Sequence, residues 1–214
     1  MRDLFQEQLH ELKRELTVMG ASCEEIIALA SQALTGWDEV LAQTVNTIGA
    51  RIDESERTIE TICMKLLLRQ QPVARDLRLI SAALKMITDM ERIGDQAEDI
   101  AEIVTFLNGR TMEGMELIEE MARETIEMVT WSVDAFVKKD VELAQKVINK
   151  DDIVDDYFSR VKCGIITLIT ENHADGEFAL DLLMIAKYFE RIGDHATNIA
   201  EWVIYSVTGT HKEV

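Results

Sequence analysis

The pentapeptide ERIGD occurs twice in this chain, at residues 91–95 within DMERIGDQAEDIAE and at residues 190–194 within YFERIGDHATNIAE. The two copies superpose at an offset of 99 residues. At this offset the apolar residues of one stretch fall on apolar residues of the other, at alternating steps of three and four. That spacing is typical of an amphipathic helix, so each copy is predicted to lie on a long helix with one buried stripe.

Two further helices are predicted to precede each copy. Apolar residues recur with helical spacing from Phe5 to a stop near Gly36, and again from Leu41 until Pro72 interrupts the pattern. The third helix carries the first ERIGD and ends at FLNGR, residues 106–110. In the second half, helices are predicted over residues 112–138, 140–171 and 177–207. Three antiparallel helices with short turns form a bundle.

The two halves of the chain repeat the same plan. Their second helices align at an offset of 102 residues, which pairs LAQ at 41–43 with LAQ at 143–145. We therefore predict an all-α protein of two tandem antiparallel three-helix bundles related by internal duplication. The predicted domains are residues 1–110 and 111–214, joined at NGRTMEG, residues 108–114.

Composition narrows the functional classes. The chain is 47% hydrophobic and has 22 Lys and Arg against 40 Asp and Glu, a net charge of −18. No basic stripe could neutralise phosphates, so direct nucleic-acid binding is not expected. No apolar run is long enough to span a bilayer. Three scattered cysteines predict reduced core thiols in a cytoplasmic protein.

The carboxylates around ERIGD lie on one helical face. With Ile93 at zero, Glu91, Asp95 and Glu98 fall at roughly 140 to 200°, opposite the apolar stripe. A solvated acidic face is the simpler interpretation. Against it, the same azimuth is apolar earlier in the helix, and like charges four residues apart cost about 0.2 to 0.5 kcal/mol per pair. Gly94 also costs about 1 kcal/mol relative to Ala inside a helix, which suggests close approach of a neighbouring helix.

A hard cation would relieve this repulsion. Carboxylates one turn apart can present several oxygens to Mg²⁺, Mn²⁺, Ca²⁺ or iron. Further ligands would come from the preceding helix, where the candidates are Asp53 and Glu56 in the first half and Asp151 and Asp155 in the second. The residues alone leave both the metal site and the solvated face open.

No catalytic constellation is evident in the sequence. Di-iron bundles need two Glu-x-x-His pairs on facing helices, whereas Glu7 and His10 form a pair without a mate. His195 aligns with Gln96 and is therefore absent from the first repeat. A nucleophile elbow, a glycine-rich phosphate loop and HExxH are all missing.

Five stretches stand out along the chain: FQEQLHELKRELTVMG from residue 5, RQQPVARDLRLI from 69, ERIGDQAEDIAE from 91, DDIVDDYF from 151 and ERIGDHATNIAE from 190. Together they resemble the PhoU family of phosphate-uptake regulators over essentially the whole chain. The resemblance implies a non-catalytic cytoplasmic accessory protein of a Pst-type phosphate ABC transporter. Such a protein would repress the phosphate-starvation response by coupling the transporter ATPase subunit to a sensor histidine kinase. It also implies a homodimer or higher oligomer that reaches the membrane through these partners.

The resemblance further implies metal binding through Glu/Asp-x-x-x-Asp motifs. The expected ligands are Asp53, Glu91, Asp95 and Asp99 in a first site, and Asp151, Asp155, Glu190, Asp194 and Asn198 in a second. The expected cofactor is a divalent or trivalent ion, Mg, Mn, Fe or Zn. Gly49 corresponds to Asp151 of the second repeat, so the first site is expected to have fewer carboxylates from its second helix.

An alternative function is a metal-dependent hydrolase or oxidase built on a helical scaffold. A redox di-iron site generally uses imidazole ligands. Because His195 beside the second ERIGD has no counterpart in the first repeat, the sequence favours the adaptor.

Overall fold

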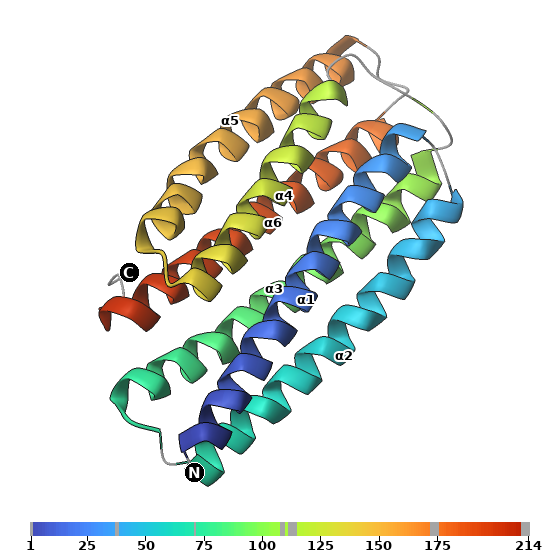
Figure 1. Ribbon diagram of the computed structural model, residues 1–214. Coiled ribbons are helices and arrows are strands. Elements are labelled where there is room, and N and C mark those ends of the chain that lie inside the picture. The colour runs from blue at the N-terminus through green and yellow to red at the C-terminus, as the bar shows by residue number, and fades with distance from the viewer. Residues whose placement is uncertain are drawn as a thin grey trace.

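The structure is a computed structural model that describes residues 2–36, 39–70, 72–107, 110, 115–171 and 176–210. Within these ranges all the regular elements are α-helices and there is no strand (Figure 1). The helices are α1 (Arg2–Gly36), α2 (Glu39–Gln70), α3 (Ala74–Leu107), α4 (Met115–Lys138), α5 (Val141–Glu171) and α6 (Gly176–Thr208). The all-α prediction is confirmed, and every predicted helix is present. The predicted junction, apart from Arg110, lies outside the described residues.

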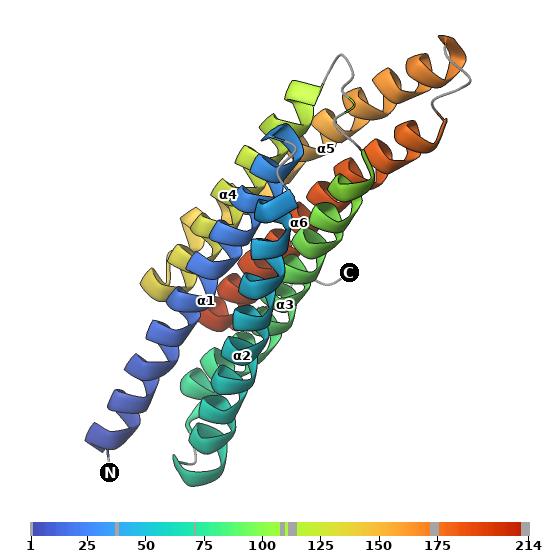
Figure 2. The same cartoon turned by 90° about the vertical axis from the view of Figure 1, so that its right-hand side faces the viewer.

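The helices form two bundles that lie side by side. Helices α1, α2 and α3 pack together, as do α4, α5 and α6, while α3 packs along α6 and α1 packs on α4. Helices α2 and α5 are therefore outermost. Figures 1 and 2 show that the bundles are staggered along a common long axis. As a result, the α2–α3 turn protrudes at one end of the rod and the α5–α6 turn at the other.

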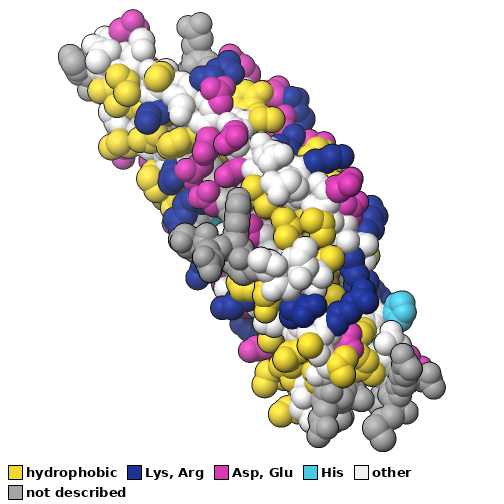
Figure 3. All heavy atoms as spheres, turned by 90° about the vertical axis from the view of Figure 1, so that its left-hand side faces the viewer, with side chains coloured by type: hydrophobic (Ala, Val, Ile, Leu, Met, Phe, Trp, Pro, Cys, Tyr) yellow, Lys and Arg dark blue, Asp and Glu magenta, His cyan; other side chains and the backbone are white. Residues whose placement is uncertain are grey.

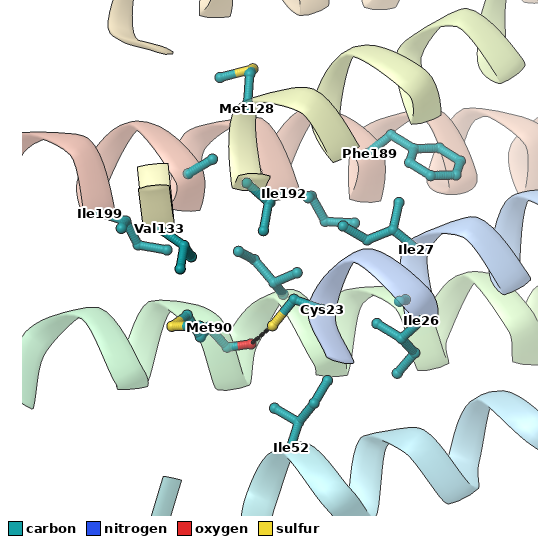
Figure 4. Close-up of a cluster of buried hydrophobic side chains, with 14 of the residues drawn as sticks. Cys23, Ile26, Ile27, Ile52, Met90, Met128, Val133, Phe189, Ile192 and Ile199 are labelled. Atoms are coloured by element: carbon teal, nitrogen blue, oxygen red, sulfur yellow. Dashed lines mark hydrogen bonds between the residues drawn. The ribbon is translucent and has the colours of Figure 1, made fainter. Parts of the chain in front are cut away.

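One continuous hydrophobic core joins the two bundles. Figure 4 shows part of it, where Cys23 and Ile27 of α1 meet Phe189 and Ile192 of α6. The apolar stripes predicted on the third helix of each repeat are buried there. Because α3 and α6 each pack against both bundles, they are the central helices of the molecule.

The cysteine prediction holds at two of the three positions. Cys23 and Cys63 are buried free thiols, and Cys23 donates a 3.5 Å hydrogen bond to the carbonyl of Met90. Burial raises the pKa of the Cys23 thiol, so it stays protonated. Cys163 is exposed instead, because it lies on α5, an outer helix with only one face against the core.

A buried polar contact links α3 to α6. Asp89 Oδ1 lies 2.9 Å from His195 Nδ1 and accepts a 3.2 Å hydrogen bond from Asn198 Nδ2. Asp89 and His195 are each only 8% exposed. At the offset of 99 residues, Asp89 and Asn198 correspond to Tyr188 and Asp99. Burial and the charge of Asp99 raise the pKa of Tyr188, so these side chains of α6 and α3 lie near one another, as expected for repeats related by an approximate twofold axis.

Candidate functional site

A first acidic cluster lies between α2 and α3. It consists of Asp53 and Glu56 of α2 and Glu91, Asp95, Glu98 and Asp99 of α3. The helices approach closely here because α3 carries Gly94. A Cβ at Gly94 would lie 3.2 Å from the side chain of Ile52 on α2. The predicted role of this glycine in close helix approach agrees with the geometry, although its direct neighbour is an isoleucine and not a carboxylate.

Glu98 occupies the space beside Gly49. A Cβ at residue 49 would overlap the Glu98 carboxylate, so this side chain of α3 lies directly against the backbone of α2. The corresponding positions in the second repeat are Asp151 and Thr197. The carboxylate is thus supplied by α3 in the first repeat and by α5 in the second. The first cluster therefore has a carboxylate at this helix contact, although Gly49 itself provides none.

A second acidic cluster lies between α5 and α6. It consists of Asp151 and Asp155 of α5 and Glu190 and Asp194 of α6. A Cβ at Gly193 would lie 3.3 Å from Oδ1 of Asp151, so this glycine lets a carboxylate of α5 approach α6. Lys187 forms an ion pair with Glu190. Asn198, predicted as a fifth ligand, donates instead to Asp89 on α3.

Burial and mutual repulsion raise the pKa values of carboxylates in the first cluster. Burial and the charge of Asp53 raise the pKa of Asp95. Burial and Asp95 also raise the pKa of Glu91 and of Glu98, with further contributions from Asp53 in both cases. These carboxylates therefore experience one another as uncompensated negative charge, which a bound cation would relieve.

The second cluster has the larger shift. Burial, Asp194 and Asp155 together raise the pKa of Asp151 to about 6 from its ordinary value of 3.8. Burial and Glu190 also raise the pKa of Asp194 and of Asp155. Asp151 lies directly against Gly193, where the packing of α5 on α6 leaves it only partly buried.

Replacing Asp151 with Asn is expected to stabilise the metal-free protein at neutral pH. Asp151 holds its proton up to about pH 6 in the folded protein, whereas its ordinary pKa is 3.8. Its protonation therefore stabilises the fold fully below pH 3.8, and this stabilisation is lost as the pH rises through about 6. After allowance for solvent screening of a half-exposed group, Asp151→Asn should raise the free energy of unfolding by about 1 kcal/mol near pH 7.5.

Urea denaturation with a chelator present measures this change. The gain should vanish near about pH 4, where Asp151 of the folded protein is already neutral. The exposed neighbour Asp152 provides the control, because Asp152→Asn should change stability by less than about 0.5 kcal/mol. A loss of stability in Asp151→Asn at neutral pH would contradict the assignment of uncompensated charge.

The donors suit a hard cation, but the side chains are not gathered around one. All candidate ligands are carboxylates, the oxygen donors that Mg²⁺, Ca²⁺ and Mn²⁺ prefer. Within the described ranges, no group of three or more His, Cys, Asp or Glu side chains is placed to hold a metal ion. Metal binding would therefore require carboxylate side chains to rotate inward. An open polar pocket of about 520 Å³ beside Glu98 and Asp99 leaves room for such movement in the first cluster.

Comparison with known proteins gives matches over the whole chain. The PhoU domain family matches residues 16–104 and again residues 118–203. A Clostridium acetobutylicum protein named phosphate-specific transport system accessory protein PhoU homolog is 35% identical, covering 100% of this chain and 98% of that protein. A Pseudomonas aeruginosa protein of the same name is 36% identical over 96% of this chain and 86% of its own length.

Solved structures match the fold equally well. The crystal structure of PhoU from Pseudomonas aeruginosa superposes with a TM-score of 0.92 at 36% identity, covering 96% of this chain and 100% of that one. The phosphate transport system regulatory protein PhoU from Streptococcus pneumoniae gives a TM-score of 0.89 at 26% identity, covering 98% of this chain and 100% of that one. In the part of the chain that the structure describes, no helix has the length and apolar character needed to cross a bilayer.

Proposed function

This chain belongs to the PhoU family, and we propose on that basis that it is a non-catalytic regulator of phosphate uptake. The observation that carries the proposal is the full-length match to proteins named as accessory to a phosphate-specific transport system. In the finer form of the proposal, the chain couples a Pst-type ABC transporter, through its ATPase subunit, to a sensor histidine kinase. It acts in the cytoplasm as a homodimer or larger oligomer and represses the phosphate-starvation response.

We also propose that the two acidic clusters bind a hard cation. The first site would use Asp53, Glu91, Asp95 and Asp99, with Glu98 as an additional ligand. The second would use Asp151, Asp155, Glu190 and Asp194. Support comes from the raised pKa of carboxylates in both clusters and from the close helix approach at Gly94 and Gly193. A bound ion would fasten α2 to α3 and α5 to α6, a structural or modulatory role.

The hydrolase or oxidase alternative gains no support from the described histidines. His195 directs Nδ1 at Asp89 in the buried contact between α3 and α6. His10 is exposed on α1, a helix of the first bundle, whereas the second cluster lies between α5 and α6. An imidazole that is engaged in packing is poorly suited to proton transfer or to metal ligation at the clusters.

Deleting the gene tests the regulatory role. We expect phosphate-scavenging functions to be expressed in phosphate-replete medium, because the repressing adaptor is lost. Reporter expression measures this, and the wild-type gene supplied in trans should restore repression. Continued repression in a strain that carries no second family member would contradict the proposal. Affinity purification from phosphate-replete cells should also recover the transporter ATPase subunit or the kinase, and recovery of neither would argue against the coupling.

A further inference from the structure

The α2–α3 turn exposes four large apolar side chains. Leu68 is 77% exposed and Val73 is 70% exposed, on either side of Pro72 at the apex of the turn. Met64 and Leu77, one helical turn further from the apex, are also exposed. Figure 3 shows apolar side chains gathered at this lower end of the rod. No described residue covers them, and they project from a convex tip.

The same end of the rod is basic, although the protein as a whole is strongly acidic. Lys65, Arg75 and Arg78 flank the apolar tip, and Asp76 is the one acidic residue among them. Among the described residues no carboxylate forms an ion pair with Lys65 or Arg75. Figure 3 shows Lys and Arg side chains in a band next to the apolar end. We call residues 64–78 of this turn the basic apolar end.

Basic character continues onto the neighbouring helices. Lys13 of α1 and Lys139, which follows α4, line a small pocket together with His10 and Asp76. Burial and the charge of Lys139 lower the pKa of Lys13, as expected where positive groups gather. Residues 64–78 therefore carry net positive charge, with Lys65, Arg69, Arg75 and Arg78 against Asp76, while α1 at the same end also presents the exposed Glu7 and Glu11.

The acidic clusters are too far away to cancel this charge. Glu91 follows Leu77 by 14 residues on one helix, a distance of about 21 Å along the axis. The Debye length at physiological ionic strength is about 8 Å. An anionic surface that meets the rod end-on therefore interacts mainly with the basic apolar end.

The depths of the two kinds of side chain match a lipid interface. Lys65 and Arg78 are set back three and five residues from Leu68 and Val73, which is about 5 to 8 Å along the helices. Amphipathic segments bury their apolar side chains by about 5 to 10 Å at the boundary of headgroups and acyl chains. With Leu68 and Val73 at that depth, the cations lie at the level of the lipid phosphates. A convex tip suits such a surface better than it suits a protein groove.

We propose that the basic apolar end binds anionic lipids directly, with the rod standing end-on to the membrane. Leu68 and Val73 enter the headgroup region, while the exposed Lys65 and Arg75 contact lipid phosphates. Arg78, whose guanidinium packs beside Gly209, adds positive charge behind them. This goes beyond the proposed function, in which the chain reaches the membrane only through protein partners. Direct lipid contact confines the chain to the surface where its partners lie.

The opposite end of the rod provides a matched control. At the offset of 102 residues Met64 corresponds to Ile166, and the α5–α6 turn likewise exposes Ile166, Leu180 and Met184. Its charged neighbours include Glu171, Glu177 and Asp181, so this turn is apolar but not basic. An anionic surface should not attract it.

Flotation of the purified full-length chain with lipid vesicles tests the proposal. A chelator is present throughout, so that metal held by the acidic clusters cannot bridge to lipid. Vesicles that contain about one third phosphatidylglycerol should bind the protein, and pure phosphatidylcholine vesicles should bind it at least about tenfold less. Binding should also weaken as salt is raised.

Variants locate the contact. Leu68→Asp with Val73→Asp should reduce binding at least about tenfold, because both insertion and charge attraction are lost. Lys65→Gln with Arg75→Gln should reduce it about tenfold. The control Leu180→Asp with Met184→Asp should bind as wild type. All sites are exposed, and unchanged circular dichroism and melting temperature would show intact folding.

Two outcomes would overturn the proposal. The first is no binding to anionic vesicles, and capture of an acidic peptide in that case would identify a protein as the occupant. The second is an equal loss of vesicle binding in the control variant, which would show that binding is not specific to the α2–α3 end. Neither outcome bears on the phosphate regulation tested by gene deletion, because the vesicles contain no transporter and no kinase.

Discussion

The double variant Glu190→Gln with Asp194→Asn is expected to lose metal binding at the second acidic cluster. Both side chains come from α6 and face Asp151 and Asp155 of α5. Amides carry no charge and are weaker donors to a hard cation, so the attraction that offsets carboxylate desolvation disappears. Changes around a metal's outer shell alone cost about 10 to 100-fold in affinity. Removing two ligands should therefore cost more than about 100-fold.

The fold should survive this double substitution. Glu190 is partly buried and Asp194 is exposed, whereas the apolar stripe of Phe189, Ile192 and Ala196 is fully buried and unchanged. The ion pair from Lys187 to Glu190 is lost, but partly exposed pairs contribute only about 0 to 1 kcal/mol. Calorimetric titration with Mn²⁺ measures the affinity, and metal analysis after gel filtration measures the amount retained.

The same helix offers a matched control. Glu177 and Asp181 are also acidic residues four apart on α6, but they lie outside both clusters. Glu177→Gln with Asp181→Asn should retain full metal binding. If the Glu190 and Asp194 variant keeps its metal, or if both double variants lose it equally, the assigned site is wrong. The acidic face would then be a solvated surface or a contact for basic residues of a partner.

The substitution Asp89→Ala should strongly destabilise the protein. Asp89 accepts from Asn198 and pairs with His195 in a site where both Asp89 and His195 are buried. Removing the carboxylate leaves the buried His195 without its partner, whereas the exposed Asn198 can bond to water. A buried group left unsatisfied costs about 1 to 3 kcal/mol, so we expect a loss of about 2 kcal/mol in the free energy of unfolding.

Urea denaturation measures this loss, and a double-mutant cycle with His195→Ala isolates the pair. Asp134, which forms an exposed ion pair with Lys138, is the control, because Asp134→Ala should cost less than about 1 kcal/mol. A change of less than about 0.5 kcal/mol in Asp89→Ala would show that the polar contact does not hold the two repeats together.

Helix order and repeat structure could be predicted because they depend on local periodicity. Each helix of this protein buries a regular apolar stripe, and Pro72 and the glycine-containing turns separate the helices. The pairing of Asp53 with Asp95 followed from the same reasoning, since consecutive helices of a bundle are neighbours.

The contacts between repeats could not be predicted in this way. The helical wheel assumed one buried stripe on the third helix, whereas α3 packs against α1, α2 and α6. Asp89 and Gln96 are polar residues at the edge of that stripe, roughly 40 and 60° from Ile93, and they are buried because α6 also packs on α3. Asn198 points to α3 for the same reason, although the alignment with Asp99 suggested a metal ligand. The direction of the Asn198 side chain follows from the packing of α3 on α6, which a helical wheel of one helix does not contain.

Glu98 belongs to the first acidic cluster but was not predicted as a ligand from the sequence. It lies on the predicted acidic face, but its importance depends on Gly49, a residue from a different helix. The available signal was the reciprocal exchange between the repeats, in which Gly49 and Glu98 align with Asp151 and Thr197. Taken alone, Gly49 in place of Asp removes a charge, and Glu98 in place of Thr adds one. Together they conserve one carboxylate at the helix contact.

If the duplicated ERIGD helices each complete a carboxylate site for a hard cation, crystals grown with Mn²⁺ should reveal bound manganese by anomalous X-ray scattering. We expect one peak between α2 and α3, contacted by Asp53, Glu91 and Asp95, and a second between α5 and α6, contacted by Asp151, Glu190 and Asp194. Crystals that show no manganese peak at either cluster, or peaks only elsewhere, would contradict this assignment.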